Sequence, residues 1–314
     1  MFPLAISGVH RGLAVLFQFL DSFAFLVLAT VGLAIIFGMM GVINLAHGEF
    51  ILVGVYGTAL AFHGIPIPLA DAALPGLPLP VAMVVGVLIT VVFGVIIERT
   101  IVKHLYDRLL DSMVATWGLG LVIAQLLLIT FGSSLDSIST PMGNVAYGPF
   151  TSGIYRSVFL PVVSILLLGA LYLLFTRTEF GVKARATIED PETARAMGVD
   201  TDRMYVMTFA LGSGLAGLTG ALYAPALGAI TPDRGSIFLV EAFVAVVVGG
   251  PSVIVGTLSA AGLLGFFNAI VTSQFGTFAG LMAMLLVAIV LLRLLPDGIT
   301  GYVEKVRQRR RAEQ

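Results

Sequence analysis

Polar side chains that could take part in chemistry lie inside otherwise apolar segments at two places. Asn44, His47 and Glu49 belong to GLAIIFGMMGVINLAHGEFILVGVY, residues 32–56, and Glu241 belongs to FLVEAFVAVV. Ionisable groups at membrane depth are costly and usually face a partner or a water-filled path. These four side chains are therefore candidates for a solute pathway, a gate or proton carriage. The alternative for both glutamates, the acids well inside apolar segments, is a buried acid bonded to a neighbouring helix.

No motif typical of an enzyme accompanies these residues. The chain has no cysteine, which excludes disulfides, thiolate metal sites and cysteine nucleophiles. The four histidines are scattered without metal-ligand spacing. Gly-Lys-Ser/Thr, GxSxG and HExxH are all missing, so the chain cannot use ATP through a P-loop of its own. We expect no catalytic residue, no metal and no cofactor.

The composition places the chain in a bilayer. Hydrophobic residues make up 58% and charged residues 11%, with a mean hydropathy of +1.03. Soluble domains carry about 25% charged residues. A soluble fold could not bury this much apolar surface. The N-terminus has only Arg11 before a long apolar run, and we expect no removable signal peptide.

Apolar segments recur along the whole chain. A crossing helix needs about 20 apolar residues. We expect an all-α polytopic membrane protein of about 8–10 transmembrane helices, with broken or re-entrant elements, in a single transmembrane domain over residues 1–314. The predicted segments are 20–41, 45–63, 80–98, 113–132, 158–176, 205–225, 237–255, 257–275 and 279–296.

The polar residues at 44–49 fall between two of these segments. Gly38 and Gly41 loosen the first segment before the polar set begins. One interpretation is a broken or tightly turned element beside a pathway, because non-helical backbone at membrane depth must be buried in protein or line a cavity. The other is a tight helical hairpin in which Asn44 caps the second helix.

Small residues four apart crowd residues 204–223. Gly212 and Ala216, and Ala216 and Gly220, have the small-xxx-small spacing that lets helix backbones approach closely in lipid. Ordinary helix packing is the favoured interpretation. The functional alternative is a helix that must also slide.

The loop 177–204 contains the signature of a short helix. Asp190 can cap it, Pro191 suits its first position and Gly198 suits a left-handed position after its end. These signals predict a helix over residues 191–197. A solvated loop with one helical turn is the alternative.

Several motifs resemble those of one transporter family. FGMMGVINLAHGEF is similar to the N-terminal signature of the membrane subunits of ABC importers for branched-chain amino acids, whose close relatives carry urea and short amides. The resemblance continues, in the family's order, at 105–125, 180–199, 209–221 and 243–256. It implies a pore-forming permease for small neutral or zwitterionic solutes, most of all branched-chain amino acids, with urea or short amides as the alternative.

The resemblance also implies partners. A second related permease subunit, two cytoplasmic ATP-binding subunits and an extracytoplasmic solute-binding protein would assemble with the chain, with alternating access driven by ATP hydrolysis in the partners. Ala194, Ala196 and Gly198 resemble the coupling helix by which such permeases dock on the ATPase. An ion-coupled secondary transporter, with Glu49 or Glu241 as proton carrier, is the rival function.

Charge asymmetry orients the chain in the inner membrane. Basic residues gather at 99–108, in the loop 177–204 and in the tail 303–314, whereas 132–157 carries only Arg156. Two predicted spans separate the first basic region from the second, and four separate the second from the tail. Both numbers are even, so all three regions share the cytoplasmic side, including the C-terminus.

This orientation predicts a labelling pattern. In the cysteine-free chain, Asn144→Cys should react in whole cells with a membrane-impermeant thiol reagent, because position 144 is expected outside. Gln308→Cys should react only after the membrane is permeabilised. Labelling of Gln308→Cys from outside intact cells would overturn the topology.

Overall fold

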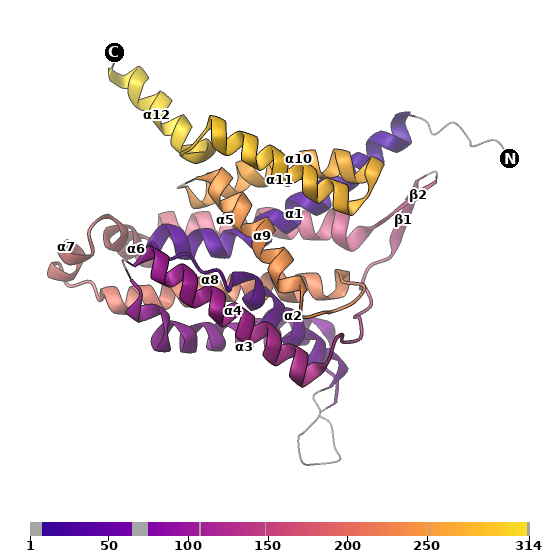
Figure 1. Ribbon diagram of the computed structural model, residues 1–314, viewed down its shortest axis with the longest axis horizontal. Coiled ribbons are helices and arrows are strands. Elements are labelled where there is room, and N and C mark those ends of the chain that lie inside the picture. The colour runs from indigo at the N-terminus through magenta and orange to yellow at the C-terminus, as the bar shows by residue number, and fades with distance from the viewer. Residues whose placement is uncertain (1–7, 65–74, 107, 148, 251, 313–314) are drawn as a thin grey trace. The chain divides into compact units, whose positions relative to one another are not determined.

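The computed structural model describes residues 8–64, 75–106, 108–147, 149–250 and 252–312 (Figure 1). As predicted, α-helices dominate. Each of the nine apolar segments overlaps one main helix: α1 (Gly8–Met40), α2 (His47–His63), α3 (Leu79–Thr100), α4 (Leu109–Phe131), α5 (Leu160–Arg177), α8 (Thr201–Tyr223), α9 (Arg234–Gly249), α10 (Val253–Phe275) and α11 (Thr277–Leu294). The bounds differ most at α1, which begins twelve residues before the segment 20–41, and at α9, which ends six residues before the end of 237–255.

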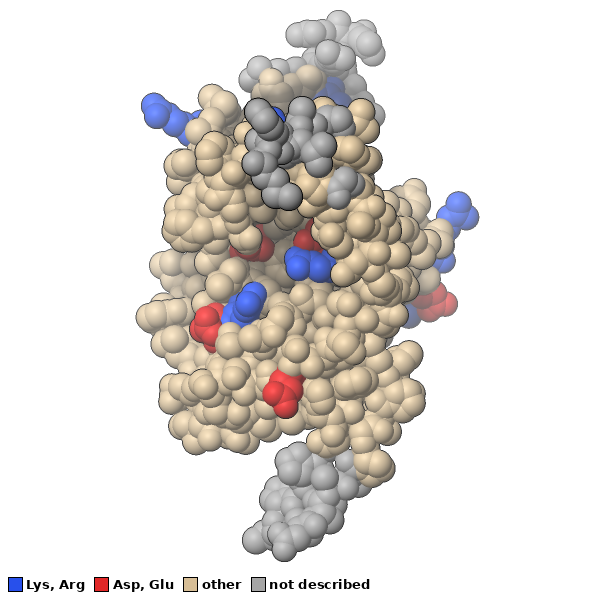
Figure 2. All heavy atoms as spheres, turned by 90° about the vertical axis from the view of Figure 1, so that its right-hand side faces the viewer, with Lys and Arg blue, Asp and Glu red and all other residues tan. Residues whose placement is uncertain are grey.

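Seven described helical segments are long and apolar enough to cross a bilayer. The two shorter apolar helices are α2, with 17 residues, and α9, with 16. Both fall below the length of about 20 residues that a crossing helix needs. They fit the broken or re-entrant elements that the sequence predicts. Figure 2 shows a face on which charged side chains are sparse among other residues.

Polar segments contain elements that the apolar pattern does not show. These are a β-hairpin, two short helices, the tail helix and three single turns: β1 (Asn144–Tyr147), β2 (Phe150–Gly153), α6 (Glu179–Glu189), α7 (Pro191–Ala196), α12 (Gly298–Ala312), the 3-10 turns η1 (Val102–His104) and η3 (Ala224–Ala226), and the π-helical turn η2 (Tyr155–Phe159). The strands pair antiparallel, with Tyr147 opposite Phe150.

The described chain forms two compact units. Unit 1 comprises residues 1–27, 140–170 and 244–314, and unit 2 comprises 28–139 and 171–243, of which only the described residues are considered. Whether they act as the single permease domain remains a prediction. In unit 1, α9 ends at Gly249, and Gly250 follows with a φ of +83°, a conformation that favours glycine.

Unit 2 is built on the close approach of α8 to three other helices. A Cβ at Gly220 would lie 2.0 Å from the carbonyl oxygen of Ile51 on α2. A Cβ at Gly32 on α1 would lie 2.6 Å from the carbonyl oxygen of Gly212, and a Cβ at Gly217 would lie 2.7 Å from Cβ of Thr90 on α3. Real Cβ atoms do not approach so closely. The small-residue spacing of α8 is therefore explained by helix packing.

This packing predicts a sharp difference between glycines. Gly220→Ala should destabilise the protein by about 1–3 kcal/mol, because the added methyl group overpacks the contact with α2. Gly118→Ala on α4 is the matched control, since its Cβ would have nothing within 4 Å. Thermal unfolding in detergent measures both. Equal stability of the two variants would contradict the packing account.

Candidate translocation site

The turn between α1 and α2 holds the polar residues at 44–49. After α1 ends at Met40, Gly41 takes a φ of +62°, a conformation that favours glycine. The Asn44 side-chain oxygen accepts a hydrogen bond from the Ala46 amide at 3.0 Å, and its carbonyl accepts one from the His47 amide at 3.2 Å. A tight turn between α1 and α2 is thus observed, as both interpretations of the sequence expect. The prediction that Asn44 is the N-cap is wrong, because Ala46 takes that position and Asn44 shapes the turn before it.

A threonine of α4 fixes this turn. The Leu45 amide donates to Oγ1 of Thr116 at 2.9 Å, and this hydroxyl lies 2.7 Å from the Ser112 carbonyl oxygen, to which it can donate. Thr116 is fully buried. One side chain therefore satisfies the backbone of the irregular segment and ties it to α4.

His47 is buried completely against α1. Its Nε2 lies 3.0 Å from the carbonyl oxygen of Ala29. A carbonyl only accepts, so Nε2 carries the hydrogen and Nδ1 of the neutral ring is an acceptor. Nδ1 has no hydrogen-bond partner among the described residues. The ring is held in place through Nε2, and Nδ1 can accept a further hydrogen bond.

Glu49 lies between two helices at glycine positions. Its carboxylate is only 6% exposed, and a Cβ at Gly120 on α4 would lie 3.2 Å from Oε2. A Cβ at Gly235 on α9 would lie 3.0 Å from Oε1. The two glycines leave the room that this carboxylate occupies. Within the described part of the chain, Oε2 has no hydrogen-bond partner.

Unpartnered polar atoms concentrate around α2. In the described chain, buried atoms without a hydrogen bond include Asn44 Nδ2, His47 Nδ1, Glu49 Oε2, Tyr56 OH and Thr58 Oγ1. Leaving a buried polar group unsatisfied costs about 1–3 kcal/mol. Such atoms, in the turn and along the short helix that follows it, can form hydrogen bonds with a polar molecule that lies beside them. Among the described residues, no three His, Asp or Glu side chains form a metal-binding group.

Glu241 lies outside this cluster. It is half-buried on α9, six residues after Gly235, which lies against Glu49. Six residues of α-helix advance about 9 Å and turn about 240°. Glu241 therefore lies on another face of α9, and its role in a pathway remains a prediction.

The predicted short helix in the loop 177–204 is present as α7. The Asp190 side chain accepts from the amides of Glu192 and Thr193 at 3.0 and 3.1 Å. Hydrogen bonds from Thr193 hold the pKa of the Asp190 carboxyl below its ordinary value of 3.8. Because the pKa of this carboxyl is lowered in the folded chain, its ionised form stabilises the cap fully at pH values above the ordinary pKa. The stabilisation is lost as the pH falls through the lowered pKa. The cap is therefore intact at neutral pH.

The end of α7 is a Schellman turn. Gly198, with a φ of +89°, donates its amide to the carbonyl of Arg195, and Val199 donates to that of Ala194 at 3.0 Å. Ala194 is 1% exposed and packs within unit 2, whereas Ala196 is exposed and Met197 is 69% exposed. Of the two alanines, only Ala196 faces outward together with Met197.

The structure also shows what sequence reasoning missed. Asp21 is a further buried acid inside an apolar helix, because α1 begins at Gly8 and not near residue 20. It forms a bidentate ion pair with Arg156, whose Nε and Nη2 donate to the two carboxylate oxygens at 3.0 and 2.6 Å. In the sequence, the isolated arginine in 132–157 was the signal that could have suggested a buried acidic partner. The α6 helix was missed as well, although Thr178 caps it by accepting from the Gly181 amide.

The seven described helical segments that are long and apolar enough to cross a bilayer define a multi-pass membrane protein. A family model described as "Branched-chain amino acid transport system / permease component" matches residues 15–295. The chain therefore belongs to this family, and it is a transport permease subunit of an ABC importer, not an enzyme. No solved structure matches it.

Three curated relatives are similar over nearly their whole lengths. The chain is 30% identical to the high-affinity branched-chain amino acid permease protein BraD of Pseudomonas aeruginosa, covering 89% of this chain and 93% of BraD. It is 30% identical to the probable permease protein LivH of Methanocaldococcus jannaschii, covering 88% of each chain. Identity to LivH of Escherichia coli K12 is 28%, covering 89% of this chain and 92% of that protein.

The position of Glu49 predicts a transport defect without a folding defect. Glu49→Gln keeps the size of the side chain and removes its charge. It should lower ATP-driven uptake about tenfold, equivalent to about 1.4 kcal/mol, while insertion and assembly persist. The exposed tail residue Glu304 supplies the control, Glu304→Gln. Wild-type uptake by Glu49→Gln would reduce Glu49 to a packing role.

Proposed function

We propose that this chain conducts branched-chain amino acids across the inner membrane as one of two permease subunits of an ATP-driven importer. The observation that carries the proposal is the similarity, over nearly the whole chain, to relatives named for branched-chain amino acid transport. A second related permease, two cytoplasmic ATP-binding subunits and an extracytoplasmic solute-binding protein complete the importer.

The cluster at α2 supports a pathway role for Asn44, His47 and Glu49. All three are buried, and each has a polar atom without a partner in the described chain. A zwitterion passing beside them could donate its ammonium hydrogens to Glu49 and His47, and accept from the Asn44 amide. These bonds would form in transit and break again, because none of the three atoms has a fixed partner within the described structure.

The loop 177–204 supports a coupling role. It lies in a region of basic residues that the charge rule assigns to the cytoplasm, as it does the C-terminus. Asp190 and Pro191 start α7 and Gly198 ends it, so the helix is held at both ends. Ala196 and Met197 present a small apolar surface that an ATPase groove could receive. Ala194 anchors α7 to its own unit.

Reconstitution tests this function. Proteoliposomes containing the chain, its partner permease and both ATPases, with the solute-binding protein outside, should accumulate L-leucine when ATP is supplied on the ATPase side. Uptake should persist with an uncoupler present. Accumulation of urea but not leucine would overturn the proposed solute. Transport that needs an ion gradient and no ATPase would overturn the mechanism.

The coupling role predicts a loss of ATPase binding. Ala196→Glu and Met197→Glu should leave the helices folded, because both side chains are exposed, yet should reduce co-purification of the ATPase and uptake about tenfold. Ala196→Ser and Met197→Leu are the matched controls. Ala194→Glu is unsuitable, because a buried charge would unfold α7 itself.

Gly198→Val extends the same test. The left-handed conformation at this position should cost a β-branched side chain about 1 kcal/mol or more. If the two glutamate variants retain the ATPase and transport at the wild-type rate, α7 is not the docking element.

A further inference from the structure

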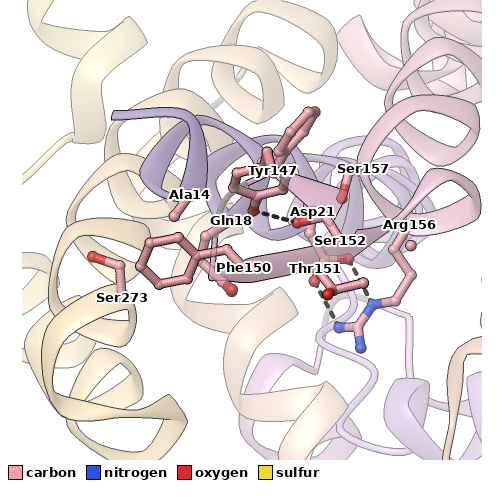
Figure 3. A pocket seen from close by; sticks show the side chains of 12 residues that line it. Ala14, Gln18, Asp21, Tyr147, Phe150, Thr151, Ser152, Arg156, Ser157 and Ser273 are labelled. Carbon is pink, nitrogen blue, oxygen red and sulfur yellow. Dashed lines mark hydrogen bonds and ion pairs between the residues drawn. The ribbon is translucent and has the colours of Figure 1, made fainter. Parts of the chain in front are cut away.

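Unit 1 contains a pocket of about 280 Å³ that the function described above does not use (Figure 3). Ligand sites for drug-sized molecules range from about 300 to 1,000 Å³, so this pocket suits a smaller solute. Its walls come from α1, the β-hairpin, η2 and α10. The polar and apolar lining residues used below are Ala14, Phe17, Asp21, Tyr147, Phe150 and Arg156.

One part of the wall carries both signs of charge. Arg156 Nε and Nη2 each donate to a different oxygen of Asp21, as the dashed lines in Figure 3 show. The Asp21 side chain is 12% exposed and the Arg156 side chain is 47% exposed. The acid is therefore set into the wall, and the guanidinium reaches the pocket and solvent.

Another part of the wall is apolar and aromatic. Phe17 of α1 lies 5.1 Å from Tyr147 of the hairpin, measured between ring centres, and Tyr147 lies 6.0 Å from Phe150. Ala14 adds a methyl group beside them. The Tyr147 and Ser152 hydroxyls bond to each other at 2.6 Å and leave the rim polar. A branched aliphatic side chain would fit against these rings.

We propose that this pocket is a zwitterion subsite of the permease, which binds the ammonium group of an α-amino acid at Asp21 and its carboxylate at Arg156. The inference rests on the proposed function and names a second place where the same solute is held. The aliphatic side chain of the amino acid packs against Phe17 and Phe150.

Charge exchange favours a zwitterion over other solutes. A zwitterion that enters the ion pair replaces each charge's partner with another of the same sign, so neither Asp21 nor Arg156 is left uncompensated. A singly charged acid or amine replaces only one partner of the pair, so the Asp21–Arg156 ion pair is lost and a single new ion pair is formed in its place. Urea offers no charge to either. The pair therefore selects zwitterions on electrostatic grounds.

The chain order places this subsite on the outer side. The hairpin and Arg156 lie in 132–157, the stretch with a single basic residue that the charge rule assigns outside. There the pocket would receive solute before the permease carries it inward. The buried turn at Asn44–Glu49 belongs to the other unit and serves as a separate contact.

Direct binding to the assembled importer tests the subsite. The complex in lipid nanodiscs, without its solute-binding protein, is probed with L-leucine by saturation-transfer NMR, which detects weak ligands. We expect a saturable signal that unlabelled L-valine displaces, and that 4-methylpentanoate and isopentylamine, which carry one charge each, do not. Arg156→Gln and Asp21→Asn should each weaken L-leucine binding at least about tenfold. Lys305→Gln, which removes another ion pair of unit 1, with Asp297, is the matched control.

A charge swap separates binding from a structural latch. Asp21→Arg combined with Arg156→Asp keeps an ion pair but exchanges the places of its charges relative to the aromatic wall. We expect this variant to assemble yet to bind L-leucine at least about tenfold more weakly. Wild-type binding by the swapped or the single variants would overturn the subsite, as would a leucine-transporting importer with no saturable signal. If the wild-type importer does not take up leucine at all, that result would instead overturn the proposed function.

Discussion

Unit 2 depends on the contact of α8 with α1 and α2 at backbone distance, and with α3 where glycines face side chains. In lipid there is no hydrophobic driving force for apolar helices to associate, so close packing and hydrogen bonds must hold them together. Glycines on both sides of the contact make this possible. Gly54 meets Gly217 and Gly32 meets Gly212, so in each pair one backbone lies against another without a side chain between. The hydroxyl of Thr219 adds a hydrogen bond to the Leu28 carbonyl across the same interface.

This contact has a consequence for the polar turn. Because α8 holds α1 and α2 tightly, the chain between them must reverse in a few residues, and the side chains of Asn44 and Thr116 accept hydrogen bonds from its backbone amides. A second close approach, between Gly48 and Gly235, brings α9 against the start of α2. Glu49 is thereby enclosed next to glycine backbone. The packing that stabilises the helices also positions the acid that we place beside the solute.

Much of this structure was predictable from the sequence because the signals are local. The apolar segments show the membrane helices, and Asp190, Pro191 and Gly198 show α7, since capping chemistry depends on residues a few positions apart. Other features depend on distant contacts. Ala194 and Ala196 look alike in sequence, yet only packing against α6 and α8 buries one of them. The pairing of Asp21 with Arg156 joins residues 135 positions apart, so no local pattern could predict it.

The central claim is that the buried turn at Asn44–Glu49 lies beside the moving solute. Because the chain has no cysteine, Glu49→Cys introduces a single thiol at that place. The decisive measurement is the rate at which a small water-soluble thiol reagent modifies this cysteine in the assembled importer, with and without L-leucine, in the ATP-free and ATP-bound states. The account predicts that L-leucine slows the modification and that ATP changes its rate. A cysteine that reacts at the same rate in every state would contradict this prediction, as would a cysteine that does not react in any state.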